Sequence, residues 1–341
     1  MDVKKLSLSS NSKMKQAKIF YFCYDHQKPT GGQKQMYRHI DILNRNGYQA
    51  YILHTQKGFR LRWFENNTKV IDGEEFTKLY NKRTDYIVLP EDLGIRILAF
   101  PGRKIIFNQN IYYGFNSFGF NKINKWPYLD KNVKFVMIVS SHNQRYLQFI
   151  FPNVRIRRIY YGVNPKKFIY KSVEQKKKMI TILPGKAPLD NNFLYQAISA
   201  RAQQNYNMLK HYVWKMVGTY TESKMSRIFG QSTIFIFLSL YEGFGMMPLE
   251  AMLSGALVVA YKRGAYSEYL NSSNSFLVDA SDKLGLVKKV EEIARKFGTE
   301  SGRKKLAKIS QNAYETAKRY SLEREEKSVL KFWDEVFHFG F

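Results

Sequence analysis

The chain has 341 residues, of which 44% are hydrophobic and 16% aromatic; this length suggests two domains, and this composition excludes a disordered tail protein. Its formal net charge of +27 predicts an anionic partner: a nucleic acid, an anionic membrane surface or a phosphorylated ligand. No apolar run reaches the ~18 residues of a membrane-spanning helix, and residues 1–16 do not have the apolar middle of a secretory signal.

The single cysteine, Cys23, cannot form an intrachain disulfide or build a thiolate metal site by itself. It lies in the apolar run KIFYFCY, so we expect a buried thiol rather than a reactive one. A reducing compartment suits this cysteine usage. We therefore expect a cytoplasmic protein, with a peripheral position at the inner face of a membrane left open.

Short apolar segments alternate with amphipathic ones in the first half, as is typical of a parallel α/β sheet. Met36, Ile40 and Leu43 recur at helical spacing, and Gly47 follows as a C-terminal stop. Strands are expected at 18–24, 49–54, 85–89, 103–107, 134–140 and 157–161.

A polar, lysine-rich run at 164–178 is expected to be a solvated linker, and a second alternating series begins after it. Strands are expected there at 178–183, 214–218, 233–239, 256–260 and 275–279, and helices at 191–204, 248–254 and 284–297. Residues 301–339 have only helical patterns. The sequence therefore predicts an α/β protein with two Rossmann-like doubly wound domains, residues 1–165 and 166–320, and a terminal helix in residues 321–341.

In open parallel sheets, ligands bind at the carboxyl ends of the strands. The first such end here is the loop DHQKPTGGQ, in which Gly31 and Gly32 begin a helix and could offer N–H groups to an anion. An ordinary strand-to-helix turn is the alternative. The GxGxxG fingerprint of dinucleotide-binding folds does not occur in this loop.

A richer strand end lies at residues 241–260, YEGFGMMPLEAMLSGALVVA. Pro248 fits the first position of a helix, because its missing N–H would be unpaired there. The preceding residues should then surround the positive end of the helix, where a phosphate is favoured. These residues are Gly243, Phe244, Gly245, Met246 and Met247.

Two carboxylates flank this expected phosphate cradle, Glu242 on the strand side and Glu250 in the first turn of the helix. Both could face one pocket, where a carboxylate would accept from the vicinal hydroxyls of a ribose or a pyranose. The alternatives are a helix cap for Glu250 and a solvated loop position for Glu242.

The segment EGFGMMPLEAMLSGALVVA, with GAYSE at 264–268, resembles the E-x7-E motif of retaining glycosyltransferase family 4. Weaker matches are GGQKQMYRHIDILNRNGYQAYILHT, SSHNQRYL and RIYYGVNPKKF, and the last has Tyr161 and Asn164 where the family typically has an asparagine and an aspartate. The resemblance implies the GT-B fold, in which two Rossmann-like domains face a cleft and a C-terminal helix crosses back to the first domain.

The resemblance also implies a reaction: retaining transfer of a hexose-like sugar from a nucleotide-sugar donor to a hydroxyl of a glycan or lipid-linked acceptor. Glu250 would hold the ribose hydroxyls, the backbone around Gly245 and Met246 the pyrophosphate, and Glu242 would lie near the transferred sugar. Lys186, in the loop ILPGKAPLDNN, would neutralise the leaving diphosphate without the arginine that usually accompanies it. Gly218 is expected to belong to the same donor-binding set.

We expect no metal and no other cofactor, because the sequence has no Asp-x-Asp and no histidine pair at zinc-binding spacing. The acceptor side should lie in the first half. Its candidates are Gln109 and Asn110 in the aromatic loop FNQNIYYGFNSFGF, Gly31, Gly32, His142 and His26.

Residues 1–165 have a net charge of +16 and could contact anionic lipid headgroups, although a generally lysine-rich composition would give the same count. The chain has no nucleic-acid-binding motif, so we expect no nucleic-acid partner. Two other functions stay open: a non-catalytic basic binding protein of GT-B fold and a GT-B sugar-nucleotide epimerase.

Overall fold

The computed structural model describes residues 17–204, 209–218 and 220–339. Residues 1–16, for which the sequence predicted no secretory signal, lie outside this description. The chain divides into two compact units, residues 1–161 with 323–341 (unit 1) and residues 162–322 (unit 2). These boundaries lie within four residues of those expected, and residues 323–341 group with the N-terminal part of the chain.

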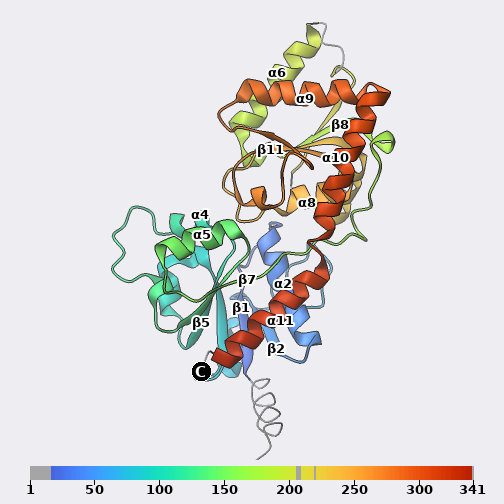
Figure 1. Cartoon of the computed structure of the whole chain (residues 1–341). Helices are drawn as coiled ribbons and strands as arrows, with labels where there is room; N and C mark the ends of the chain where they lie inside the picture. Colours follow the sequence, from blue (N-terminus) through green and yellow to red (C-terminus); the bar gives the residue numbers. More distant parts are fainter. Residues whose placement is uncertain (1–16, 205–208, 219, 340–341) are drawn as a thin grey trace, which may run out of the picture. The chain divides into compact units, whose positions relative to one another are not determined.

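In its described residues, unit 1 contains a seven-stranded parallel sheet of order β3-β2-β1-β4-β5-β6-β7 (Figure 1). The strands are β1 Lys18–Phe22, β2 Gln49–Leu53, β3 Val70–Ile71, β4 Tyr86–Pro90, β5 Arg103–Asn108, β6 Val133–Ile138 and β7 Ile156–Arg158. Six of them fall at the expected segments. The sequence did not reveal β3, because two residues show no periodicity.

The helices among the described residues of unit 1 are α2 Gly31–Arg45, α3 Gly73–Leu79, α4 Ile111–Asn116, α5 Ser141–Ile150 and α11 Leu322–Phe339, with 3₁₀ segments η1 Glu91–Ala99 and η2 Pro127–Leu129. Thr30 caps α2 by accepting from the Gln33 N–H. Gly47 follows the helix at a φ of 84°, which agrees with the expected stop. Cys23 is buried, and burial raises its pKa to about 12, as expected for a core thiol.

Helix α11 packs its apolar face on unit 1 beside α2 (Figure 1). Trp333 is fully buried, donates from Nε1 to the Tyr21 hydroxyl at 3.3 Å, and its ring lies 5.9 Å from that of Tyr86. At the other end of the helix, the fully buried Glu325 accepts from Arg38 at 2.7 Å. The tail therefore completes the core of unit 1.

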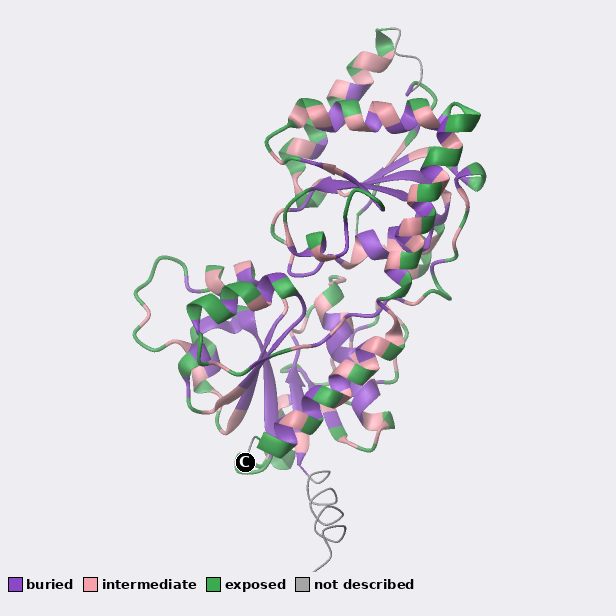
Figure 2. Cartoon of the chain, viewed as in Figure 1, coloured by how far each residue is buried: buried purple, intermediate pink, exposed green. Residues whose placement is uncertain are grey.

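Unit 2 has, in the residues that are described, a five-stranded parallel sheet of order β12-β11-β10-β8-β9. Figure 2 shows that the strands of both sheets are largely buried. The elements of unit 2 are η3 Val173–Gln175, β8 Lys177–Ile182, η4 Pro184–Lys186, α6 Pro188–Gln203, β9 Val213–Met216, α7 Glu222–Gln231, β10 Ser232–Phe237, α8 Met246–Leu253, β11 Leu257–Tyr261, η5 Ala265–Glu268, β12 Phe276–Val278, α9 Lys283–Phe297 and α10 Glu300–Lys318.

The expectation of a solvated linker at 164–178 was wrong, because this segment belongs to unit 2 and buries Phe168, Val173 and Lys176. The Lys176 ammonium donates to the carbonyls of Phe229 and Ser254, at the ends of α7 and α8. Helix C-termini carry carbonyls with no intrahelical partner, so one lysine satisfies two helix ends. Burial lowers the pKa of Lys176 to about 7.

We predict that Trp333→Ala lowers the free energy of unfolding of unit 1 by about 3–5 kcal/mol, because it leaves a large cavity under α11. The matched control is Phe339→Ala in the same helix, where the exposed ring should cost less than about 0.5 kcal/mol. Urea titration of both variants gives the comparison. Equal losses in the two variants would show that α11 does not complete the core.

A second prediction concerns pH. Burial, together with the neighbouring Arg38, lowers the pKa of His39 to about 3. An unfolded histidine titrates near 6.5, so between these two pKa values the unfolded state binds one more proton and stability falls as the pH falls. Between pH 7.5 and pH 5, wild type should lose about 2 kcal/mol more than His39→Gln in urea titrations. Equal losses of unfolding free energy in wild type and His39→Gln would contradict a neutral His39. The control is His26→Gln, which removes an exposed histidine and should lose as much as wild type.

Candidate functional site

The strand order of unit 2 has a switch point between β8 and β10. The chain continues from β8 to β9 on one side and then returns to place β10 on the other. The loops that leave the two strands therefore diverge, and the space above such a point is where open α/β sheets bind ligands. The loop after β8 contains Lys186, and the loop after β10 contains Glu242.

These two residues meet at the switch point, where the Lys186 ammonium lies 2.6 Å from Oε1 of Glu242. The Ser239 hydroxyl donates to the same carboxylate oxygen at 3.0 Å. The lysine side chain is 39% exposed and the glutamate side chain 14%, so solvent reaches the cation more easily than the carboxylate. The structure thus joins the two residues expected to be catalytic, from loops 56 residues apart.

Helix α8 begins two residues earlier than expected. Gly245 caps it with a left-handed φ of 83°, and Met246 is its first residue. Pro248 is therefore the third residue and not the first, and Glu250 lies in the second turn and not the first. Glycine tolerates the left-handed cap, and proline fits the third position because the first four helical N–H groups have no intrahelical acceptor. The N–H groups of Met246 and Met247 thus lie at the positive end of the helix.

Two tyrosines support this loop from the protein side, and the sequence analysis did not identify them. The Tyr266 hydroxyl donates to the Ser239 carbonyl at 2.6 Å, and the Tyr269 hydroxyl donates to the Gly245 carbonyl. A β-carbon on Gly245 would lie 3.3 Å from the Tyr269 hydroxyl. Glycine is therefore needed here for its φ and for tyrosine packing, rather than to keep open space for a phosphate. The signal available in the sequence was their position, because Tyr266 lies within the GAYSE stretch at 264–268 and Tyr269 directly follows it.

The other expected donor residues lie around the same edge of the sheet. Glu250 is half-buried on α8, and Gly243 is buried in the loop before it. Phe244 is buried and packs against Tyr269 and Tyr320, with ring centroids 5.6 and 5.7 Å apart, so it has a core role. Gly218 is exposed after β9, with no heavy atom within 4 Å of its β-carbon position.

A further cation that sequence reasoning missed lies at this edge. The Lys283 ammonium is 2.7 Å from the Asp190 carboxylate, which also accepts from the Tyr261 hydroxyl at 2.5 Å. Burial raises the pKa of Asp190, but these two hydrogen bonds outweigh it and the net shift is downward. Asp190 is therefore ionised at neutral pH and holds the start of α6 to the end of β11.

Unit 1 has its own switch point, between β1 and β4. The Tyr24 hydroxyl, after β1, donates to Asp92, after β4, at 2.9 Å. Nearby, a β-carbon on Gly32 would lie 2.3 Å from the Gln109 amide oxygen, which accepts from the Tyr161 hydroxyl at 2.8 Å. Glycine at position 32 is thus required for Gln109 to lie against α2, whereas Gly31 has no heavy atom within 4 Å.

The remaining acceptor-side candidates take part in local contacts. Asn110 is buried, and its side-chain oxygen caps α4 by accepting from Tyr112 N–H, which gives it a structural role. Its own N–H donates to Glu91 at 2.6 Å, and burial raises the pKa of this carboxyl to about 8. His142 is buried and its Nε2 lies 2.9 Å from the Tyr112 hydroxyl.

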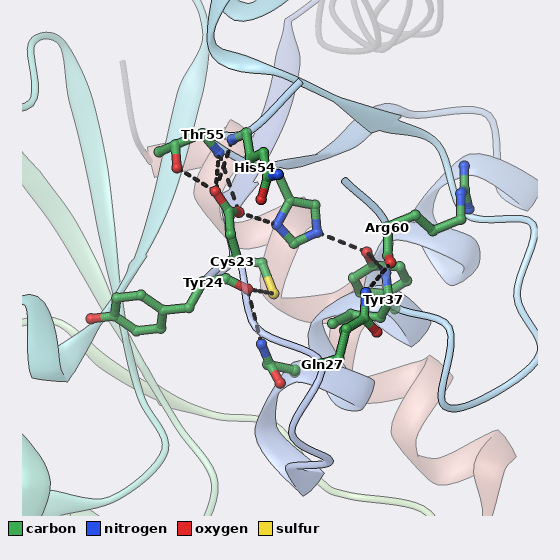
Figure 3. A network of polar contacts seen from close by, with 11 residues as sticks. Cys23, Tyr24, Gln27, Tyr37, His54, Thr55 and Arg60 are labelled. Carbon is green, nitrogen blue, oxygen red and sulfur yellow. Dashed lines mark hydrogen bonds and ion pairs between the residues drawn. The ribbon is translucent and has the colours of Figure 1, made fainter. Parts of the chain in front are cut away.

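A buried polar network holds the loop after β1 (Figure 3). His54 Nδ1 lies 2.7 Å from Asp25, and its Nε2 lies 2.8 Å from the Tyr37 hydroxyl. Leu61 N–H donates to that hydroxyl oxygen at 3.1 Å. Burial lowers the pKa of His54, so the ring is neutral, donates from Nδ1 and accepts from Tyr37. His26, next to this network, is exposed and its ring stacks with that of Tyr24.

Among the described residues, no group of three or more His, Cys, Asp and Glu side chains could hold a metal ion. Within that same part of the chain, no helix is both long enough and apolar enough to cross a membrane.

Residues 199–316, within unit 2, match the family model "Glycosyl transferases group 1". The chain is 25% identical over 270 residues to an alpha-1,6-glucosyltransferase of Actinobacillus pleuropneumoniae serotype 7 (strain AP76), which covers 76% of each protein. Residues 199–316, the region that the family model matches, contain Glu242 and Glu250.

Two solved structures show the same fold. Sucrose-phosphate synthase from Thermosynechococcus elongatus superposes with a TM-score of 0.66 at 13% identity, over 94% of this chain and 99% of the other. Anabaena Alr3699/HepE, solved in complex with UDP-glucose, superposes with a TM-score of 0.62 at 15% identity, over 93% and 99%. The expected GT-B architecture of two Rossmann-like parallel-sheet domains is confirmed.

Proposed function

We propose that this GT-B protein is a glycosyltransferase that moves a sugar from a nucleotide-sugar donor to a hydroxyl of a glycan or lipid-linked acceptor, in polysaccharide or glycoconjugate biosynthesis. The observation that carries the proposal is the Lys186–Glu242 pair at the switch point of unit 2, where Glu242 lies in the loop that leads into α8. The glucosyltransferase relative and the UDP-glucose bound by the Anabaena protein support it.

Charge is the physical basis of the donor site. A sugar leaves its nucleotide as a diphosphate that gains negative charge in the transition state, and fixed cations and helix ends stabilise such charge. Lys186 supplies the cation, and the N–H groups of Met246 and Met247 supply the positive helix end. Glu250 accepts from the ribose hydroxyls, one turn further along α8.

The ion pair gives each partner a second role. While no donor is bound, Glu242 neutralises Lys186 at 2.6 Å and keeps the cation in place. A diphosphate carries more negative charge than one carboxylate, so it competes for the ammonium. Glu242, still held by Ser239, is then available to the hydroxyls of the transferred sugar. Donor binding thus exchanges the charge partner of Lys186 and leaves the Glu242 carboxylate hydrogen-bonded to Ser239 and to the sugar hydroxyls.

We propose retention of configuration by a same-face displacement, in which the leaving phosphate takes the proton of the acceptor hydroxyl. Such a transfer needs no dedicated carboxylate base, and catalysis then depends on orientation and on stabilising the leaving group. On the acceptor side, we propose that Gln109, which accepts from Tyr161, and the exposed His26 contact the hydroxyls of the acceptor from the carboxyl edge of unit 1.

The test of the donor site begins with a thermal-shift panel of UDP-, GDP- and dTDP-sugars, since a true ligand raises the melting temperature by mass action. For the donor that stabilises the protein, Glu250→Ala should weaken binding at least tenfold by calorimetry, because hydrogen bonds to a charged acceptor are each worth about 1.5–3 kcal/mol. Glu242→Ala should reduce turnover more than it reduces affinity for the free nucleoside diphosphate.

The matched control is Glu300→Ala, which removes an exposed glutamate from another helix of unit 2 and should change neither quantity. No stabilisation by any nucleotide sugar would contradict the proposed function. Unchanged donor affinity in Glu250→Ala would contradict only the ribose assignment.

Transfer should not depend on a divalent metal. Lys186 and the α8 terminus offer the diphosphate its positive charge, and the described residues contain no group of ligands for a metal ion. We expect wild type dialysed against excess EDTA to keep its rate of sugar transfer within about twofold. A loss that Mg²⁺ or Mn²⁺ restores would show that the site recruits a cation from solution.

A further inference from the structure

One stretch of unit 1 is almost purely basic. Residues 93–160 contain eleven lysines and arginines and one acid, Asp130. That acid is buried, and its carboxylate lies 3.2 Å from the buried Lys104 ammonium and 4.0 Å from the exposed Lys125 ammonium, so one acid faces two of these cations and the stretch keeps a large excess of positive charge. The exposed cations of the stretch include Lys122, Lys125 and Arg145.

The same stretch exposes large apolar side chains. They are Ile95, Tyr113, Phe120, Leu129, Tyr146, Phe149 and Ile150. Phe149 is 88% exposed and Phe120 fully exposed, although aromatic rings are the side chains whose burial contributes most. A cluster of such residues marks an interaction site more often than scattered single ones do.

Helix α5 presents half of this cluster on one face. His142, Asn143 and Leu147 point inward and are buried. On the outer face, Phe149 and Ile150 lie one turn beyond Arg145 and Tyr146, at i+4 spacing. Figure 2 shows exposed residues along this outer side of the helix.

The loop between α4 and η2 presents the other half. Its base is fixed, because the Trp126 ring packs against Phe118 at 4.7 Å and against Phe151, at the end of α5, at 5.9 Å. Phe120 lies outside this aromatic base, just after Gly119, which has a positive φ of 58°. The loop projects from the unit beside α4 and α5 (Figure 1). An anchored loop with an aromatic side chain and lysines beyond its base suits insertion into an interface.

We propose that this surface, made by residues 113–131 and the outer face of α5, docks on an anionic lipid bilayer. Aromatic and aliphatic side chains enter the headgroup region, while Lys122, Lys125 and Arg145 contact lipid phosphates. The excess of positive charge favours an anionic partner. The exposed Phe149 and Ile150 favour a partner with an apolar interior, such as a bilayer, over a nucleic acid. Docking does not depend on the proposed chemistry.

The position of this surface suggests a role for the docking in acceptor binding, and this role rests on the proposed function. Helices α4 and α5 begin at the carboxyl ends of β5 and β6, the edge of the sheet that carries Gln109 and His142. A bilayer against these helices would present the hydroxyls of a lipid-linked acceptor at that edge.

The experiment is co-sedimentation of the full chain with two kinds of vesicle, one of phosphatidylcholine alone and one that also contains about 30% phosphatidylserine. We expect at least tenfold tighter binding to the anionic vesicles, weakening as salt is raised. The variants Phe120→Ser with Phe149→Ser, and Lys122→Glu with Lys125→Glu, should each weaken binding to anionic vesicles at least tenfold.

Matched controls lie in unit 2: Leu284→Ser for an exposed apolar side chain, and Lys288→Glu with Lys305→Glu for charge reversal. Equal binding to both vesicle types overturns the proposal, as does equal weakening by the controls. Binding to a single-stranded RNA probe without vesicle binding overturns it too. The shift in melting temperature that the stabilising nucleotide sugar causes in each variant reports on the donor site separately. A variant that loses this shift but still binds anionic vesicles contradicts the donor site and not the docking proposal.

Discussion

In both units every pair of neighbouring strands that the structure describes is parallel, and this one constraint determines where a site can form. A parallel sheet needs a crossover after each strand, so all carboxyl ends meet at one edge and the loops there are not used for pairing. The residues that bear chemistry lie in these loops. Lys186 follows β8 and Glu242 follows β10, which are neighbours in the sheet although β9 lies between them in sequence. Two loops distant in the chain thus form one ion pair.

Three buried charged side chains hold helices and loops elsewhere in the two units, and each of the three has a partner. Lys176 donates to the carbonyl ends of α7 and α8, Glu325 accepts from Arg38 between α11 and α2, and Lys104 pairs with Asp130 beneath the basic loop. A buried ion costs several kcal/mol unless it is paired. These contacts therefore specify one arrangement of helices, because any slip of an element would leave a charge unpaired.

The two units differ in what they leave exposed. The candidate donor site has its polar groups paired internally, as Glu242 is with Lys186 and Ser239. The face of unit 1 formed by α4, α5 and their loop instead leaves aromatic rings and cations to solvent, with Phe120 and Phe149 the most exposed. Paired and fixed polar groups such as those of the candidate donor site suit a small molecule that bears phosphates. An exposed apolar and basic face such as that of α4, α5 and their loop suits an extended anionic surface.

Short apolar runs predicted eleven of the twelve described strands, because parallel strands buried on both faces give continuous apolar runs such as STIFIF. The glycine-rich segment at 242–250 identified the candidate donor site, because its residue types at that spacing are unusual. Other features depended on contacts distant in sequence. Tyr266 and Tyr269 became visible only where they bond Ser239 and Gly245, and Lys176 was mistaken for a solvated residue because its acceptors lie 53 and 78 residues away. The start of α8 was misplaced because a left-handed φ at Gly245 is a property of the folded backbone. Local pattern determines the elements, since it reflects burial of each face, whereas partners of buried polar groups are decided only when the sheet brings its strand ends together.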